Sequence, residues 1–232
     1  AGKGSAELQA AMKEWKEGQN VAEQLMEVSI EDLLPREQIM VDMKNVERQL
    51  RNKKVLITGS AGSIGSEIVN QVASCQPDAM LLIDQAETPL HDIRLMMKNS
   101  YPDLTVRTVV ASITEKQHME SLFRLFRPDY VFHAAAYKHV PMMEDNPSEA
   151  IFNNVVGTKI LADLSVKYGV KKFVMVSTDK AVNPTNVMGC SKRICEIYVQ
   201  SLDAEQKKHA GEKPATQFVT TRFGNVLGSN GS

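Results

Sequence analysis

The chain has 232 residues, 43% of them hydrophobic, which is enough for one large domain with a filled core and an extension. Lys and Arg total 27 against 28 Asp and Glu, and this near-neutral balance argues against bulk nucleic-acid binding or attraction to an anionic membrane. No apolar run approaches the roughly 20 residues that cross a bilayer. The three cysteines lack the spacing of a disulfide framework, so we expect a cytoplasmic protein. The five histidines lack metal-ligand spacing, so we expect no metal.

The first fifty residues differ from the rest and carry no chemistry that we can identify. Residues 29–32 resemble a capping box ahead of a short helix that Pro35 limits. A further helix is expected over residues 42–50. We therefore assign residues 1–50 to a helical extension and residues 51–232 to a single domain.

From residue 53 onward, short apolar runs alternate with amphipathic segments of helix length. The runs are rich in β-branched residues, and strands are expected over residues 55–57, 80–83, 106–110, 130–132, 173–176 and 218–221. Apolar strands that alternate with helices are typical of a parallel sheet covered on both faces. The pattern predicts an α/β fold with a doubly wound parallel sheet.

A glycine turn follows the first of these strands. Its three glycines stand three residues apart, a spacing that permits a tight turn, lets backbone amides approach a pyrophosphate and packs the next helix against the sheet. The diphosphate then faces the positive end of that helix. The pattern predicts a Rossmann site for a dinucleotide. The turn residues expected to contact it are Gly59, Ser60, Gly62, Ser63, Ile64 and Gly65.

An acidic residue ends the next strand. Asp84 comes about twenty residues after the last glycine, where a carboxylate accepts hydrogen bonds from the adenosine ribose hydroxyls. Its charge would repel a 2′-phosphate and no Arg follows directly, so the pattern favours NAD over NADP. Gln85 is expected to contact the cofactor beside it. A glycine-rich loop without a ligand is the alternative interpretation.

The glycine spacing resembles that of the extended short-chain dehydrogenase/reductases, and longer motifs narrow the resemblance. They are similar to motifs of the nucleotide-sugar 4,6-dehydratases of bacterial polysaccharide biosynthesis, of the UDP-N-acetylglucosamine type. The segments that carry this resemblance are residues 133–141, 154–158, 177–186 and 222–229. Residues 30–37 also resemble the segment before the catalytic domain in long, membrane-anchored members. The resemblance implies a longer parent anchored to the inner membrane, with this domain on the cytoplasmic side.

The resemblance also implies a reaction with a tightly bound NAD. Hydride passes from sugar C4 to NAD⁺, the ketone acidifies the C5 proton, water is lost across C5 and C6, and the hydride returns to C6. The resemblance places Ala134, Ala135, Ala136, Asn154 and Ser177 at the cofactor, and Lys138 and Asn225 at the UDP-sugar.

Three polar residues follow a strand at its carboxyl end, the edge where open α/β sheets bind ligands. Dehydration needs a base for the C5 proton and an acid for the departing C6 hydroxyl. We expect Asp179 to be the acid, Lys180 the base and Thr178 a hydrogen-bond partner near O4. Lys180 can act as a base only when uncharged, and a charged Lys180 would stabilise a C5 enolate instead. A surface Asp-Lys pair is the alternative.

The chain departs from the wider family one helical turn before Lys192. Most relatives carry Tyr there, so that phenol and amine share one helix face. Here Met188 occupies the position and cannot accept a proton. Met is normal at this site in the long-form dehydratases, and Lys192 can still hold the nicotinamide ribose. The acceptor of the C4 hydroxyl proton stays open between Asp179 and a water.

Three functions are compatible with these motifs. We favour the 4,6-dehydratase over a nucleotide-sugar epimerase of the same fold, because epimerases normally rely on the Tyr that Met188 replaces. The third is an NAD-binding module without catalysis. The C-terminal substrate lobe of extended members is expected to begin near Ser232, so we expect this chain to bind cofactor but turn over poorly. We also expect a homo-oligomer, since helices of this fold often pair between subunits.

Overall fold

The structure is a computed structural model that describes residues 42–208, 215–224 and 226. Its contacts separate residues 43–232 from residues 1–42, and the fold below is that of the larger unit. The expected capping box at residues 29–32 lies outside the described residues. The helix expected over residues 42–50 is present as α3 (Met43–Leu50), and it buries Leu50 in the core of the larger unit.

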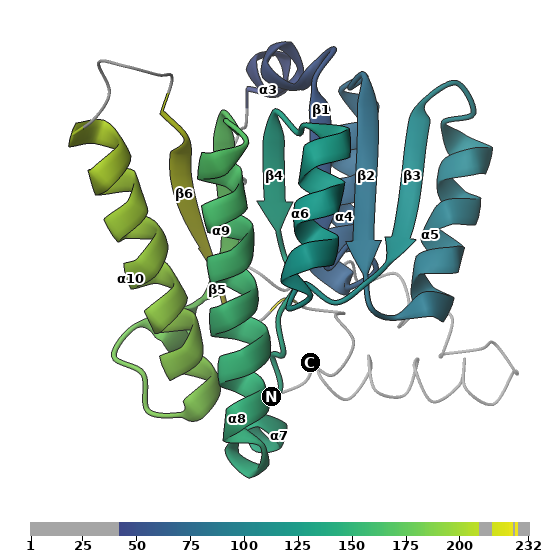
Figure 1. The fold of residues 1–232 in the computed structure, drawn as a ribbon. Helices are drawn as coiled ribbons and strands as arrows, with labels where there is room; N and C mark the ends of the chain where they lie inside the picture. Colours follow the sequence, from purple (N-terminus) through teal and green to yellow (C-terminus); the bar gives the residue numbers. More distant parts are fainter. Residues whose placement is uncertain (1–41, 209–214, 225, 227–232) are drawn as a thin grey trace, which may run out of the picture. The chain divides into compact units, whose positions relative to one another are not determined.

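Six parallel strands form one sheet in the order β3-β2-β1-β4-β5-β6 (Figure 1). They are β1 (Lys54–Thr58), β2 (Ala79–Asp84), β3 (Thr105–Val110), β4 (Tyr130–His133), β5 (Lys172–Thr178) and β6 (Gln217–Phe223). All six expected strands are present, and the doubly wound Rossmann fold is confirmed. The strand order reverses between β1 and β4, which makes this point of the sheet the expected ligand crevice.

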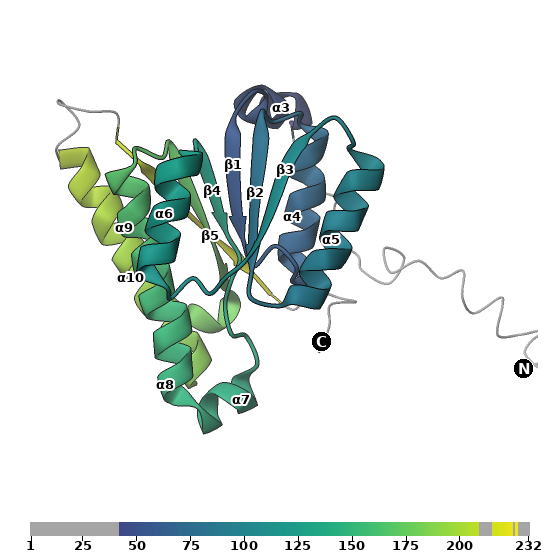
Figure 2. The same ribbon diagram turned by 45° about the vertical axis from the view of Figure 1, so that its right-hand side comes forward.

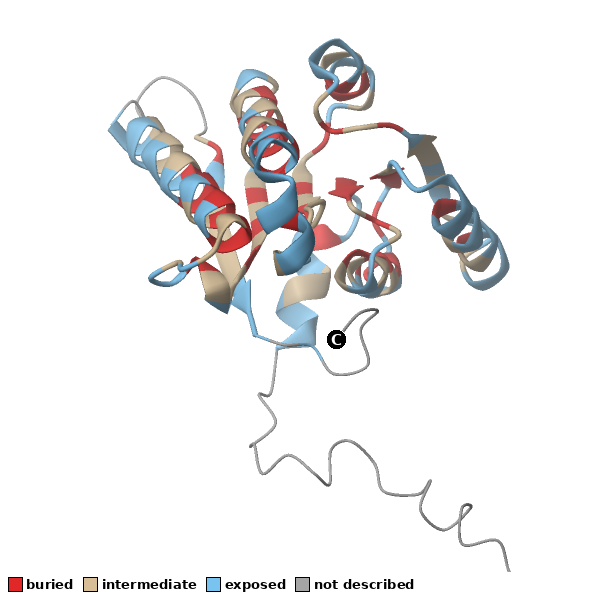
Figure 3. Ribbon diagram, turned by 90° about the horizontal axis from the view of Figure 1, so that it is seen from below, coloured by how far each residue is buried: buried red, intermediate tan, exposed pale blue. Residues whose placement is uncertain are grey.

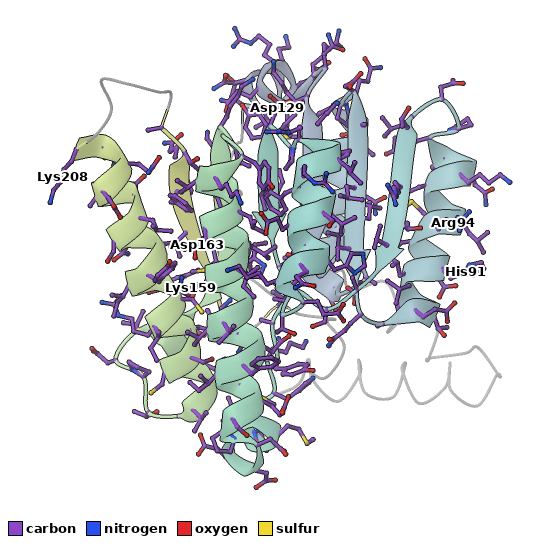
Figure 4. All side chains as sticks on the ribbon, viewed as in Figure 1. His91, Arg94, Asp129, Lys159, Asp163 and Lys208 are labelled. Atoms are coloured by element: carbon purple, nitrogen blue, oxygen red, sulfur yellow. The ribbon has the colours of Figure 1, made fainter. Side chains whose placement is uncertain are left out.

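Helices cover both faces of the sheet (Figure 2). One face carries α4 (Ser63–Ser74) and α5 (Glu87–Ser100), and the other carries α6 (Lys116–Phe126), α9 (Gly157–Lys167) and α10 (Val187–Lys208). On α9, Lys159 and Asp163 form an ion pair of 2.6 Å one turn apart (Figure 4), and Tyr198 of α10 donates a hydrogen bond to the same carboxylate. Among the described helices, none is long and apolar enough to cross a membrane.

Two buried apolar clusters lie on opposite faces of the sheet. In β1, Val55 and Ile57 belong to the cluster under α4 and α5, whereas Leu56 belongs to the cluster under α6, α9 and α10. Successive side chains of a strand point to opposite faces, so both faces must be apolar when both are covered. This explains why the strands read as continuous apolar runs.

The carboxyl ends of the strands form the lower edge of the sheet in Figure 1, and Figure 3 looks onto this edge. After β4 the chain continues through α7 (Val140–Asp145), α8 (Pro147–Glu149) and the π-helix η3 (Ala150–Val156) before α9. After β5, the 3-10 turn η4 (Asp179–Ala181) leads to α10. The predicted site residues that are described therefore come together at one edge.

Candidate functional site

Two adjoining cavities open at the carboxyl edge of the sheet. The smaller, about 220 Å³, includes Asp84, Gln85 and Asn153 in its wall, and the larger, about 1120 Å³, includes Lys180 and Lys192. The residues that line both are Gly59, Gly62, Ala134 and Ala136. A groove that is continuous over a glycine floor fits an extended ligand with two ends, such as a dinucleotide.

The glycine turn has two glycines that the turn itself requires and one that it does not. Gly59 has a φ of +68°, and a Cβ there would lie 2.4 Å from the backbone nitrogen of Ala135. A Cβ on Gly65 would lie 1.8 Å from the carbonyl oxygen of Gly59. On Gly62 the nearest atom would be 3.5 Å away, which is ordinary contact. The bare Gly62 therefore leaves room on the ligand side of the turn.

Gly62 is also the N-cap of α4, and it supplies no side-chain cap for the helix. The first amides of a helix without a cap are available to an anion, and the helix dipole favours negative charge there. Together with the room above Gly62, this fits a diphosphate. Ser63, Ile64 and Gly65 line the larger cavity, and their contacts with a cofactor stay a prediction.

Ser60 faces the other way. It is fully buried, its hydroxyl donates to the carbonyl oxygen of Ile83 at 3.3 Å, and it lines neither cavity. The structure therefore shows Ser60 attaching the turn to β2. Its expected contact with the cofactor stays a prediction.

The carboxylate of Asp84 is held by two backbone amides. Ala61 donates to Oδ2 and Ala86 donates to Oδ1, each at 2.9 Å. Each carboxylate oxygen keeps a further lone pair, so the group can still accept from ribose hydroxyls. Asp84 and Gln85 both line the smaller cavity, where the adenosine half of a dinucleotide is expected.

Asn154 supports the site from behind. It is fully buried, its Oδ1 accepts from the amide of Tyr137 at 2.8 Å, and its Nδ2 donates to the carbonyl of Tyr137 and to Ser191 Oγ, each at 3.0 Å. Asn154 thus joins the segment after β4 to the start of α10. Its neighbour Asn153 lines the smaller cavity, whereas Asn154 lines neither, so a direct cofactor contact of Asn154 stays a prediction.

His133 is the first residue of the motif at residues 133–141, and the structure gives it a supporting role. It is fully buried between Thr58 and Thr158, with 2.8 Å from Nδ1 to one hydroxyl and 2.8 Å from Nε2 to the other. Burial, with a smaller contribution from the charge of Lys192, lowers the pKa of His133 to about 3. The neutral ring therefore links β1, β4 and α9 beneath the site.

The end of β5 and the turn η4 present two of the three residues predicted there to the larger cavity, namely Thr178 and Lys180. Thr178 Oγ1 accepts from the amide of Lys180 at 3.3 Å and donates to Asp179 Oδ1 at 2.9 Å. Lys180 Nζ lies 3.4 Å from the same carboxylate oxygen. The hydroxyl of Thr178 and the amine of Lys180 thus both contact the same oxygen of Asp179.

Asp179 is 58% exposed and ionised at neutral pH. The hydrogen bond from Thr178, followed by that from Lys180, lowers the pKa of this carboxyl below its usual value. In this form the group accepts hydrogen bonds and does not donate a proton. The expected acid role of Asp179 therefore requires that it gain a proton when substrate binds.

Lys192 and Met188 lie one turn apart on α10, and both are buried in the wall of the larger cavity. Burial lowers the pKa of the Lys192 amine. Within the described part of the chain, no hydrogen bond or ion pair holds this amine, so it can donate to ligand hydroxyls. The role of Lys192 in holding the nicotinamide ribose stays a prediction.

Two further predicted positions concern the sugar nucleotide. Lys138 lines the larger cavity, and Asn225 lies outside the described residues. Ala134 and Ala136 line both cavities, and Ala135 lines the smaller one.

The family described as "Polysaccharide biosynthesis protein" matches residues 55–232. The chain belongs to this family. Among curated relatives, capsular polysaccharide biosynthesis protein CapD of Staphylococcus aureus is 46% identical over 90% of this chain and 34% of its own length. A UDP-N-acetylglucosamine 4,6-dehydratase (inverting) of Campylobacter jejuni is 34% identical over 78% of this chain and 51% of its own length. A UDP-glucose 4-epimerase of Rickettsia canadensis has the same identity and coverage.

Solved structures agree with this membership. Pen from Bacillus thuringiensis is 31% identical with a TM-score of 0.70, over 79% of this chain and 55% of that one. The Bordetella bronchiseptica enzyme WbmG, solved with NAD and UDP, is 25% identical with a TM-score of 0.54, over 63% of this chain and 49% of that one. The resemblance to extended short-chain dehydrogenase/reductases of the nucleotide-sugar type is confirmed. The chain spans about a third to a half of the curated relatives described above.

Proposed function

We propose that this domain binds NAD and is the catalytic core of a UDP-N-acetylglucosamine 4,6-dehydratase of glycan biosynthesis. One observation carries the proposal: Thr178, Lys180 and Lys192 open into a single cavity that continues over the glycine floor into the Asp84 pocket. Proton-transfer groups are therefore adjacent to a groove that fits a dinucleotide. The dehydratase among the relatives supports the same reaction.

NAD is preferred to NADP because the Asp84 carboxylate faces the adenosine pocket. The bare Gly62 and the start of α4 would hold the diphosphate, and Lys192 would hold the nicotinamide ribose. The bound cofactor supplies a reversible hydride acceptor that ends the cycle unchanged. The NAD found in the WbmG structure supports this choice.

The residues from Thr178 to Lys180 would carry out the proton transfers of the elimination. Lys180 takes the C5 proton, Asp179 protonates the departing C6 hydroxyl, and Thr178 is a hydrogen-bond partner near O4. Because Asp179 and Lys180 lie 3.4 Å apart, a proton taken by one group lies close to the other. Lys138 and Asn225 would bind the UDP-sugar.

Epimerisation at C4 is the second candidate, favoured by the UDP-glucose 4-epimerases among the relatives. That reaction normally uses a Tyr at the position of Met188, whose thioether offers no proton here. A module that binds NAD without catalysis is the third candidate. The Thr178–Lys180 segment would then have no substrate.

Incubation of the full-length protein with UDP-N-acetylglucosamine, followed by mass spectrometry, separates these candidates. The dehydratase gives a product lighter by one water, the epimerase gives an isomer of unchanged mass, and the binding module gives neither. Cofactor released on denaturation identifies NAD or NADP. In Lys180→Ala, loss of C5 deuterium exchange with retained NAD would support the base role, whereas unchanged exchange would refute it.

The setting of the domain is proposed on the same basis. We propose residues 1–50 as an extension ahead of the catalytic domain, of which α3 packs on that domain through Leu50. The parent protein is a homo-oligomer anchored to the inner membrane, with this domain on the cytoplasmic side. Light scattering of the purified protein measures the oligomer, and a monomer at micromolar concentration would contradict it. Membrane fractionation of the full-length protein tests the anchor.

A further inference from the structure

One buried carboxylate at the carboxyl edge of the sheet has no part in the chemistry proposed above. Glu196 of α10 is fully buried, and it accepts four hydrogen bonds from three residues. The donors are Ser177 Oγ and Arg222 Nε to Oε1, each at 2.8 Å, and Arg222 Nη2 at 2.6 Å and Arg193 Nη1 at 3.0 Å to Oε2. A single carboxylate therefore joins α10, β5 and β6.

Glu196 is ionised at neutral pH. Burial raises the pKa of this carboxyl, but the hydrogen bonds from Arg222, Ser177 and Arg193 outweigh burial and hold the pKa to about 2. Both arginine side chains are 41% exposed, so each can be hydrated if the carboxylate is lost. A buried ion pair is weak support for stability and is better regarded as a device that specifies geometry.

The register of β5 and β6 shows which geometry is specified. Ser177 and Arg222 are direct partners in the ladder, and Glu196 binds both. The next pair is Thr178 and Phe223, and both line the larger cavity. Glu196 thus binds the strand pair that directly precedes Thr178 and Phe223.

The residue that follows β6 lies near the proposed acid. A Cβ on Gly224 would lie 3.9 Å from Asp179 Oδ2, which is ordinary van der Waals contact. On α10, Lys192 lies one turn before Glu196 and lines the larger cavity. A shift of β6 relative to β5 would therefore move the groups around Asp179.

We propose that Glu196 is a positioning residue that aligns the carboxyl ends of β5 and β6 at the larger cavity. Through Ser177 and Arg222 it fixes the Thr178–Lys180 segment against the end of β6. Its effect on turnover rests on the proposed function, whereas the alignment itself does not.

The test compares Glu196→Gln with Glu120→Gln in the full-length protein. Glu120 pairs with Lys167 at the surface, away from both cavities, so its variant removes one carboxylate charge without touching the site. Misplaced reacting groups cost between about tenfold and a hundredfold in rate. We expect that fall in kcat for Glu196→Gln, with full NAD content and KM within about threefold, and a kcat for Glu120→Gln within about twofold of the wild type.

A double variant distinguishes alignment from general destabilisation. If Glu196 acts through Arg222, Glu196→Gln combined with Arg222→Gln should lose no more kcat than the worse single variant. Additive losses would overturn the proposal.

Backbone hydrogen exchange measures the alignment without the reaction. In Glu196→Gln, exchange should rise at residues 176–179 and 221–224 and stay unchanged in β1 and β2. A uniform rise, or no rise, would overturn the inference. If the wild type gives no dehydrated product, the proposed function fails and the exchange pattern alone decides the role of Glu196.

Discussion

The two edges of the sheet are held by polar contacts of different kinds. At the amino edge, labelled by Asp129 in Figure 4, a partly exposed carboxylate accepts from the amide of Lys54 at 3.0 Å and pairs with Lys171 at 2.7 Å. At the carboxyl edge, His133 and Glu196 are fully buried and fully bonded. Exposed pairs contribute little and tolerate change, whereas buried polar groups are costly to leave unpaired. The edge that carries the site is therefore the one that tolerates change least.

The largest effect is expected in the glycine turn. Gly65→Ala places a Cβ 1.8 Å from Gly59 O, so the turn must shift and NAD should be lost, with an affinity at least about a hundredfold lower. Gly62→Ala is the matched control, since its Cβ meets nothing closer than 3.5 Å. It should keep the melting temperature of the free protein and weaken NAD binding. Thermal unfolding with and without NAD measures both, and a Gly65→Ala protein that binds NAD normally would refute the role of the turn.

Next in size is the pH dependence of stability from His133. Its pKa is about 3 in the folded chain and about 6.5 when unfolded. Between these values the unfolded chain binds a proton that the folded chain does not. Stability from this group is therefore complete above pH 6.5 and falls with decreasing pH, by up to about 1.4 kcal/mol per unit. Urea unfolding between pH 7 and 5 avoids the titration of Glu196 below its ordinary value of 4.5.

Substitution of His133 should remove that slope. His133→Asn is expected to reduce stability at pH 7 and to flatten the dependence between pH 7 and 5. His91 is exposed on α5 (Figure 4), so His91→Asn should change neither quantity. Equal slopes in the wild type and His133→Asn would contradict the assignment.

A smaller effect is expected at Lys192. Lys192→Met removes a buried amine, so the free protein should be at least as stable as the wild type, while NAD binds about tenfold more weakly because a hydrogen bond from the amine to the ribose is lost. Isothermal titration gives the affinity, and thermal unfolding gives the stability. Unchanged NAD affinity would remove Lys192 from the cofactor site.

The smallest effect is expected at the amino edge. Asp129→Asn keeps an acceptor for the amide of Lys54 and loses only the ion pair with Lys171, which is 53% exposed. The loss of unfolding free energy should stay below about 1 kcal/mol, with NAD affinity unchanged. A loss in urea unfolding as large as that of His133→Asn would abolish the contrast between the two edges.

The sequence predicted what depends on near neighbours in the chain. Strand periodicity, the glycine turn and the acidic end of β2 are local patterns, and each lies where it was expected. The pairing of Ser177 with Arg222 depends on the register of two strands separated by a long helix, so the role of Glu196 could not be derived from spacing. Likewise, the direction in which the Asn154 side chain points depends on η3 being a π-helix, and no pattern in the sequence predicted a π-helix there.

That π-helix makes the length of its segment as important as its composition. Removal of one residue from Ala150–Val156 would let the segment form an α-helix. The residues before the deletion would then be rotated by roughly 100° about the helix axis relative to those after it. Asn154 could then no longer bond both Tyr137 and Ser191, even though the chain still contained both partners. Relatives that diverge freely in sequence here should therefore align without gaps across these seven positions.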